Sequence, residues 1–268
     1  MSDHPEDQQE EDARPFVAPC VTIEPLAPLR WLRAGWQDFR AAPGASLIYG
    51  LIMVSLSYLM TVAAWWFGNM GLYLGLISGF VFLGPVLALN LYAISIQLQR
   101  GRPATLRESL SHVRQCLGDA LTYTIIMIVV FLIWARAANL MYIFYPVNEW
   151  HWQDIVLFFG VGSSVGAVFC AIIFTASVFS LPMIMDRRAD MVTGIITSIN
   201  AVLRNKLAFL VWAGVIGLCL LAGLLTAYLG LAVVLPVLGY ATWHAYRESI
   251  DASAWEARFE LPPEEGAG

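Results

Sequence analysis

Long runs of residues without a formal charge alternate along this chain with short polar stretches. A helix that crosses a hydrocarbon core of roughly 30 Å needs about 20 apolar residues, and four runs have that length, one of them interrupted only by Arg136. A further uncharged run, from Leu207 to Tyr246, would reach about twice the core as one helix. We expect that run to turn back near Tyr228 to Gly230. The pattern therefore predicts an all-α, polytopic membrane bundle of six transmembrane helices, at about residues 46–66, 72–97, 120–145, 155–185, 207–226 and 231–246.

The basic residues test this count, because the cytoplasmic loops of membrane proteins are rich in Lys and Arg. The chain has 15 Lys and Arg, and with six spans every one except Arg136 falls on the same side of the membrane. The longest connection on the opposite side, 146–154, carries Glu149 and Asp154 and no basic residue. We therefore predict that both termini lie in the cytoplasm.

The composition is typical of an integral membrane protein. Hydrophobic residues make up 59% of the sequence and charged residues 13%, with a mean hydropathy of +0.66. These values exclude a disordered protein, and a net charge of −5 with scattered arginines excludes a nucleic-acid binder. Only the two ends are strongly acidic. We predict an acidic, disordered cytoplasmic tail over residues 1–29, a membrane domain over 30–250 and an acidic cytoplasmic tail over 251–268.

Three segments with apolar residues at helical spacing precede the odd-numbered spans, and they include Leu32, Leu106 and Val192. Each is predicted to be a short amphipathic helix at the inner membrane surface. One proline lies in each even-numbered span, namely Pro85, Pro182 and Pro236. We interpret these features as three copies of surface helix, outward span and inward span; the alternative is chance recurrence of common membrane residues. The prolines are expected to kink their helices, which either encloses a cavity or only fits the helices together.

Small residues recur at helical spacing in two of the predicted spans, as they do where membrane helices pack closely. They are Gly71, Gly75 and Gly79 in the second span and Gly162 and Gly166 in the fourth. We expect these stripes to seat helices within the bundle. The alternative is a contact with a membrane-protein partner or a second copy of the chain. The other expected partners are membrane lipids, and no nucleic acid.

Few polar residues lie inside the predicted spans, and those few are the candidate functional residues. Arg136 is the only basic one; it lies about 26 Å along its helix from the inner end, near the outer surface. There it can reach water or pair with an acidic loop residue; an anion or substrate site is the alternative. Asn90 and Asn139 are expected to form interhelical hydrogen bonds rather than to bind a ligand.

No motif for catalysis or for binding a cofactor or metal stands out. Residues 162–166 formally match G-x-S-x-G, but that nucleophile motif requires a strand, a sharp turn and a histidine. The 4 histidines lie outside the predicted spans or at their ends, and no two have ligand spacing. We therefore expect no catalytic, cofactor-binding or metal-binding residue, and no enzyme.

Four motifs follow one another in a specific order along the chain. They are LRAGWQDFRAAPGASLIYG at 32–50, FLGPVLALNLY at 82–92, LPMIMD at 181–186 and LPVLGYATWHAY at 235–246. Together they resemble an uncharacterised bacterial integral-membrane family, domain of unknown function 2189. The resemblance extends over about residues 30–250 and implies a six-helix protein of the bacterial cytoplasmic (inner) membrane. It implies no activity, because the family has none established.

Short loops and the lack of a chemical constellation favour a non-enzymatic interaction or assembly component of the membrane. The alternative is a small-solute transporter or channel built on the three proline-containing helices. A transporter needs polar residues that converge on a water-filled cavity near the middle of the bilayer. A scaffold is expected instead to have a filled bundle and one exposed stripe of small residues.

Overall fold

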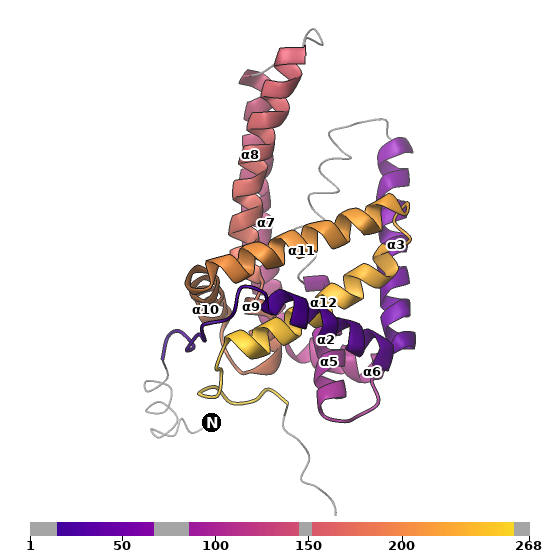
Figure 1. Ribbon diagram of the computed structural model, residues 1–268, viewed down its shortest axis with the longest axis vertical. Helices are drawn as coiled ribbons and strands as arrows, with labels where there is room; N and C mark the ends of the chain where they lie inside the picture. The colour runs from indigo at the N-terminus through magenta and orange to yellow at the C-terminus, as the bar shows by residue number, and fades with distance from the viewer. Residues whose placement is uncertain (1–14, 67–85, 145–151, 260–268) are drawn as a thin grey trace, which may run out of the picture.

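The computed structural model describes residues 15–66, 86–144 and 152–259, and this part of the chain is built from helices (Figure 1). The only strand-like pairings among these residues are two isolated bridges, Cys20 to Ile250 and Arg187 to Ala257. The helices are α2 (Ala27–Ala41), α3 (Pro43–Trp66), α5 (Leu89–Gln99), α6 (Leu106–Gln115), α7 (Leu117–Phe144), α8 (Trp152–Ser177), α9 (Ser180–Asp186), α10 (Met191–Arg204), α11 (Lys206–Leu225) and α12 (Leu231–Ser249).

Several helices are suited to a membrane. Among the described residues, four stretches are long and apolar enough to cross one, and they are Pro43–Ala63, Leu117–Ala137, Phe159–Asp186 and Lys206–Leu225. They coincide with the first, third, fourth and fifth predicted spans, which confirms an all-helical chain with several apolar membrane helices. Most of the predicted second span lies outside the described residues, and α5 forms its inner end. The predicted sixth span corresponds to α12, which is not among these four stretches.

The amphipathic segments also form helices where the sequence predicts them. These are α2, α6 and α10, and each directly precedes a long apolar helix. Side chains cap two of them: the Thr105 hydroxyl accepts the N–H of Glu108 at α6, and the Asp190 carboxylate accepts the N–H of Thr193 at α10. The order of short helix and long helix therefore occurs three times in the described residues.

The uncharged run 207–246 turns back where it was predicted to. Between α11 and α12, Ala227 and Tyr228 both adopt positive φ, at 51° and 69°. The Thr226 hydroxyl bonds to the carbonyl of Gly223 and accepts the N–H of Gly230, which satisfies backbone groups at the turn. This turn brings α12 back along α11.

The predicted fourth span is broken near its inner end. α8 stops at Ser177 and α9 begins at Ser180, with Pro182 in the first turn of α9. Ser198 of α10 bridges the break, because its hydroxyl accepts the Phe179 N–H at 3.1 Å and donates to the Thr175 carbonyl at 2.7 Å. A neighbouring helix thus satisfies backbone groups that the break leaves without helical partners.

Pro236 acts through a carbonyl on α12. A proline cannot donate to the carbonyl four residues earlier, which here is that of Ala232. A Cβ built on Gly50 of α3 would lie 1.9 Å from this carbonyl oxygen. In the same way, a Cβ on Gly35 of α2 would lie 2.5 Å from the carbonyl oxygen of Val237. Glycine therefore lets α2 and α3 touch the backbone of α12, and the carbonyl that Pro236 leaves without a helical donor lies at the contact with α3.

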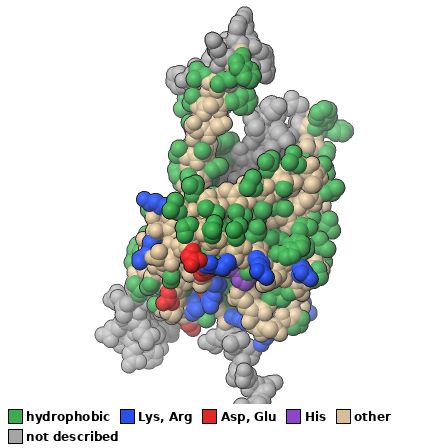
Figure 2. Space-filling model, in the orientation of Figure 1, with side chains coloured by type: hydrophobic (Ala, Val, Ile, Leu, Met, Phe, Trp, Pro, Cys, Tyr) green, Lys and Arg blue, Asp and Glu red, His purple; other side chains and the backbone are tan. Residues whose placement is uncertain are grey.

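The core lies at one end of the molecule, where α2, α9, α11 and α12 converge (Figure 1). It is aromatic: the rings of Trp31 and Trp212 meet edge to face at 5.7 Å, and Trp243 and Tyr246 lie 5.5 Å apart. The far ends of the long helices are exposed instead, as the 87% exposure of Trp65 on α3 shows. Figure 2 shows the same division, with charged side chains gathered near the core end and hydrophobic ones covering the face beyond it.

Parts of both predicted tails are ordered, in contrast to the expected disorder. Ala18 and Cys20 are buried, and the Ala18 N–H donates to the Thr197 hydroxyl at 3.1 Å. At the other end, Trp255 and Phe259 are buried to 4% and 8% exposure. The acidic composition of these segments favours disorder, but their few apolar side chains find places in the core. We call residues 251–259 the C-terminal strap.

Candidate functional site

The residues singled out from the sequence do not form one site. Pro85 lies outside the described residues, as does the side chain of Asn139. Asn90 lies in α5, and its Oδ1 atom is buried without a hydrogen-bond partner among the described residues. Arg136 lies exposed on α7, while the acidic side chains expected to pair with it are not described. We find no polar cavity that these residues share in the described part of the chain.

One of the two predicted glycine stripes lies in the described part of the chain, and the other does not. Gly71, Gly75 and Gly79 lie outside the described residues. A Cβ added to Gly162 or Gly166 would meet nothing within 4 Å, so the stripe on α8 seats no described helix. Its predicted role inside the bundle therefore finds no support among the described residues. The alternative, contact with another molecule, stays a prediction.

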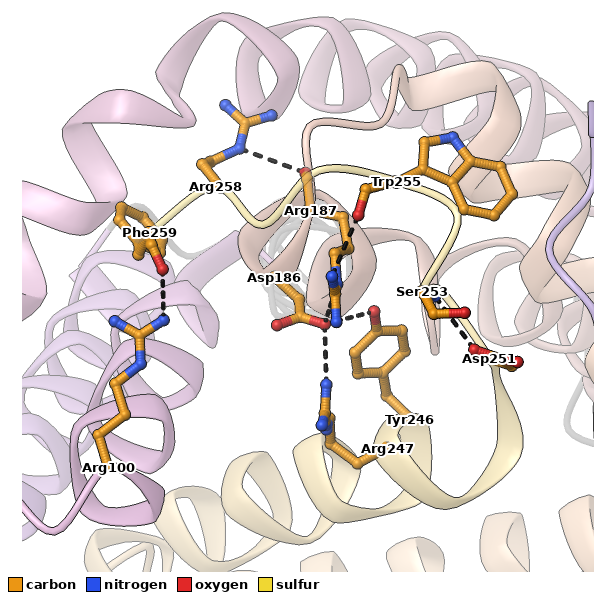
Figure 3. A network of polar contacts seen from close by, with 10 residues as sticks. All are labelled: Arg100, Asp186, Arg187, Tyr246, Arg247, Asp251, Ser253, Trp255, Arg258 and Phe259. Carbon is orange, nitrogen blue, oxygen red and sulfur yellow. Dashed lines mark hydrogen bonds and ion pairs between the residues drawn. The ribbon is translucent and has the colours of Figure 1, made fainter. Parts of the chain in front are cut away.

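The most connected polar cluster is centred on Asp186, at the end of α9 (Figure 3). One oxygen of its carboxylate accepts hydrogen bonds from Arg187 Nε at 3.0 Å, from Arg247 Nη1 at 3.1 Å and from the Tyr246 hydroxyl at 2.9 Å. The side chain of Asp186 is only 14% exposed. Charge-assisted bonds of this kind hold the end of α9 against the end of α12.

The C-terminal strap is tied to the same cluster. The Arg258 guanidinium pairs with Asp119 of α7 at 2.7 Å. The backbone N–H of Arg258 donates to the Asp186 carbonyl at 3.0 Å. Arg100, directly after α5, donates to the Phe259 carbonyl at 2.7 Å. Sequence patterns do not reveal the contact between Asp119 and Arg258, because the two residues lie far apart in the chain. We call Asp186 and the residues bound to it, together with the Arg258–Asp119 pair, the clamp; the hydrogen-bond donors and acceptors named for it are paired with one another.

A second cluster joins α2, α5 and α12. One carboxylate oxygen of Asp38 lies 2.6 Å from the Ser95 hydroxyl, which donates to it, and 2.9 Å from Nε2 of His244. The Ser46 and Tyr240 hydroxyls pair nearby at 2.7 Å. Serine and histidine both contact the acid rather than each other, so this is not the arrangement of a serine nucleophile with its base. Helical spacing alone does not bring these residues together.

An apolar cavity of about 360 Å³ lies between α3, α5, α8, α11 and α12. Its walls include Met53, Leu91, Ile173, Phe174 and Leu238. Neither Asn90 nor Arg136 is among its lining residues. A cavity of this character suits hydrocarbon better than a polar solute.

Cysteine and metal chemistry find no support in the described residues. All four cysteines are free thiols, and Cys20 and Cys116 are buried. Burial raises the pKa of Cys116 to about 11, which keeps that thiol protonated and unreactive at neutral pH. Among the residues described, we find no group of three or more His, Cys, Asp or Glu side chains that could hold a metal ion.

Comparisons with known proteins find a family model that matches the middle of the chain. No curated protein and no solved structure is significantly similar to it. A family model described as "Predicted integral membrane protein (DUF2189)" matches residues 72–186, a stretch that contains two of the motifs quoted above. The resemblance is therefore confirmed over residues 72–186, which match the DUF2189 family of predicted integral membrane proteins.

Proposed function

We propose that the protein is a non-enzymatic interaction or assembly component of the bacterial inner membrane. The observation that carries the proposal is the hairpin of α7 and α8, which extends well beyond the core end of the molecule (Figure 1). In the predicted span Leu117–Ala137, only 17% of the most apolar window is buried. The hairpin therefore offers a long apolar surface to lipid or to another membrane protein.

The face of α8 is suited to a close helix contact. Gly162 and Gly166, one turn apart on the same side of α8, each have space free of described residues where a side chain would begin. Small residues at this spacing allow two membrane helices to approach closely enough for their backbones to touch. A flat, unoccupied glycine face on a projecting hairpin is the surface expected of a scaffold.

A transporter of small polar solutes finds less support. Such a protein needs polar groups around a cavity, and the lining of the 360 Å³ cavity named above is dominated by aliphatic and aromatic side chains. Asn90 and Arg136, the first residues to suspect, lie elsewhere. The prolines also act in ways that need no cavity: Pro182 sits in the first turn of α9, and Pro236 frees the carbonyl that faces Gly50.

The proposal includes six spans with both termini in the cytoplasm, built as three repeats of surface helix and helical hairpin. The threefold order of α2–α3, α6–α7 and α10–α11 supports it, as does the gathering of charged side chains at the core end. Reporter fusions test the topology: one near Trp150 should report the periplasm and one near Arg187 the cytoplasm. Fusions that report a single compartment would refute it.

Affinity purification in mild detergent tests the function. We expect a specific membrane protein, or a second copy of the chain, to co-purify with the wild type and to be lost with the double variant Gly162→Leu, Gly166→Leu. The matched control is Gly214→Leu, an equally open glycine on α11. Loss with the control as well, or recovery of a bound polar solute and no protein, would contradict the proposal.

A further inference from the structure

A second hollow lies outside the bundle core, between α2 and α11. The two helices meet where Trp31 of α2 contacts Trp212 of α11, and they diverge from there with α12 behind them (Figure 1). The space between them is a groove of about 420 Å³. Leu32 and Trp36 of α2 form one wall, Cys219 of α11 the other, and Val234 and Val237 of α12 the floor.

One charged side chain borders this apolar groove. Arg33 lines it and is exposed to solvent, and no carboxylate among the described residues pairs with its guanidinium. Arg30, one turn earlier on the same helix, is paired with both Glu24 and Glu248. The difference matters because a guanidinium without a protein partner is available to bind an anion bidentately.

The position of α2 sets the depth of Arg33 in the membrane. The buried side of α2 packs on α12 through Gly35, while Leu29 and Trp36 are exposed at 53% and 45% on the groove side. Tryptophan and arginine are the residues that settle at the headgroup level of a bilayer. Figure 2 shows blue side chains along the level of α2 and hydrophobic ones over α11 beside it, so the groove joins a cationic rim to an apolar floor.

We propose that this groove binds an anionic diacyl phospholipid, with one acyl chain between α2 and α11 and the phosphate on the Arg33 guanidinium. The apolar walls exclude a free phosphate or a polar peptide as the main occupant. The charge of Arg33 favours anionic over zwitterionic lipid. A zwitterionic headgroup carries its own cation, which offsets the attraction between its phosphate and the guanidinium, whereas an anionic headgroup carries none. Trp36 covers the glycerol region of the same lipid.

The test uses the full-length protein reconstituted in nanodiscs of phosphatidylcholine with a minor fraction of phosphatidylglycerol. Retained lipid is counted by native mass spectrometry, and contact with Trp36 is read from fluorescence quenching by phosphatidylglycerol brominated on its acyl chains. We expect the wild type to be enriched in phosphatidylglycerol and Trp36→Phe to lose a distinct part of the quenching. Arg33→Gln should weaken enrichment about tenfold, the effect of losing one charge-assisted hydrogen-bond pair, and Arg33→Lys should restore part of it.

The matched control is Arg107→Gln, which removes an exposed arginine on α6, away from the groove. Equal enrichment in Arg33→Gln and wild type would overturn the proposal, as would equal retention of the two lipids by the wild type. A second copy of the chain in the groove is the competing occupant. It predicts that Cys219 is shielded from maleimide in the dimer whatever the lipid, and that result would also overturn the proposal.

Discussion

Substituting Gly35 by alanine tests the crossing of α2 over α12, the helix pair around which the core end of the molecule is built. A Cβ at this position would lie 2.5 Å from the carbonyl oxygen of Val237 and 2.7 Å from the amide nitrogen of Ala241. Atoms in ordinary contact are about 3.5–4.0 Å apart, so the two helices must separate by about 1 Å. Both obstacles are backbone atoms, which no rotamer change can remove.

The expected cost follows from two opposing effects. Overpacking of this kind destabilises a protein by about 1–3 kcal/mol, while replacing a helical glycine by alanine stabilises the helix by about 1 kcal/mol. We therefore expect Gly35→Ala to lower the free energy of unfolding by up to about 2 kcal/mol. The control Gly214→Ala makes the same chemical change in α11, where the new Cβ meets nothing within 4 Å, and it should raise the free energy of unfolding by up to about 1 kcal/mol.

The assay is unfolding of the purified protein by dodecyl sulfate in mixed micelles, followed by circular dichroism and tryptophan fluorescence. The two variants should shift the midpoint in opposite directions. If Gly35→Ala moves the midpoint upward together with Gly214→Ala, the two backbones do not touch at this position and the described packing of α2 is wrong.

Three further outcomes follow from the polar end of the molecule. Burial lowers the pKa of His112 below its usual 6.5, and its ring stacks on Phe259 at 4.0 Å. The folded state therefore favours the neutral ring, so the packing of His112 on Phe259 contributes its full stability above pH 6.5 and loses it as the pH falls below that value. Protease cleavage of the C-terminal strap should accordingly increase on acidification, and His112→Phe should abolish this dependence. With the folded protein in detergent micelles, the buried Cys116 should resist maleimide, whereas the exposed Cys170 should react. Mass spectrometry of the labelled peptides measures both reactions. Asp186→Asn should lower the free energy of unfolding by about 1–3 kcal/mol, and a midpoint like that of the wild type would show that the clamp contributes nothing.

Local sequence patterns predicted the helices well, because a span needs only enough apolar residues in a row and an amphipathic helix only the right period. The turn at Tyr228 was found by length alone, since one helix could not accommodate the whole uncharged run. The break before Pro182 was not located, because its position depends on Ser198 of a different helix. Sequence periodicity carries no information about such a partner.

The tertiary contacts were the part that sequence reasoning missed. It selected Gly162 and Gly166, which repeat regularly, yet the described glycines that come closest to the backbone of another helix are the isolated Gly35 and Gly50. Whether a glycine packs depends on what faces it, and that partner is distant in the chain. The acidic tails were judged from composition, which averages over the few side chains, such as Trp255, that anchor them.

The pairing of the two ends of the helical region constrains biogenesis. Trp31 donates to Glu248 at 2.7 Å, and the Val21 N–H donates to the Ser249 carbonyl at 2.9 Å. Translation must reach Ser249 before the first helix can dock, so α2 and α3 wait in the bilayer without their partner while the intervening helices are inserted. An insertase or chaperone that shields the glycine faces of α2 and α3 during that interval would act on a nascent chain, not on the finished protein.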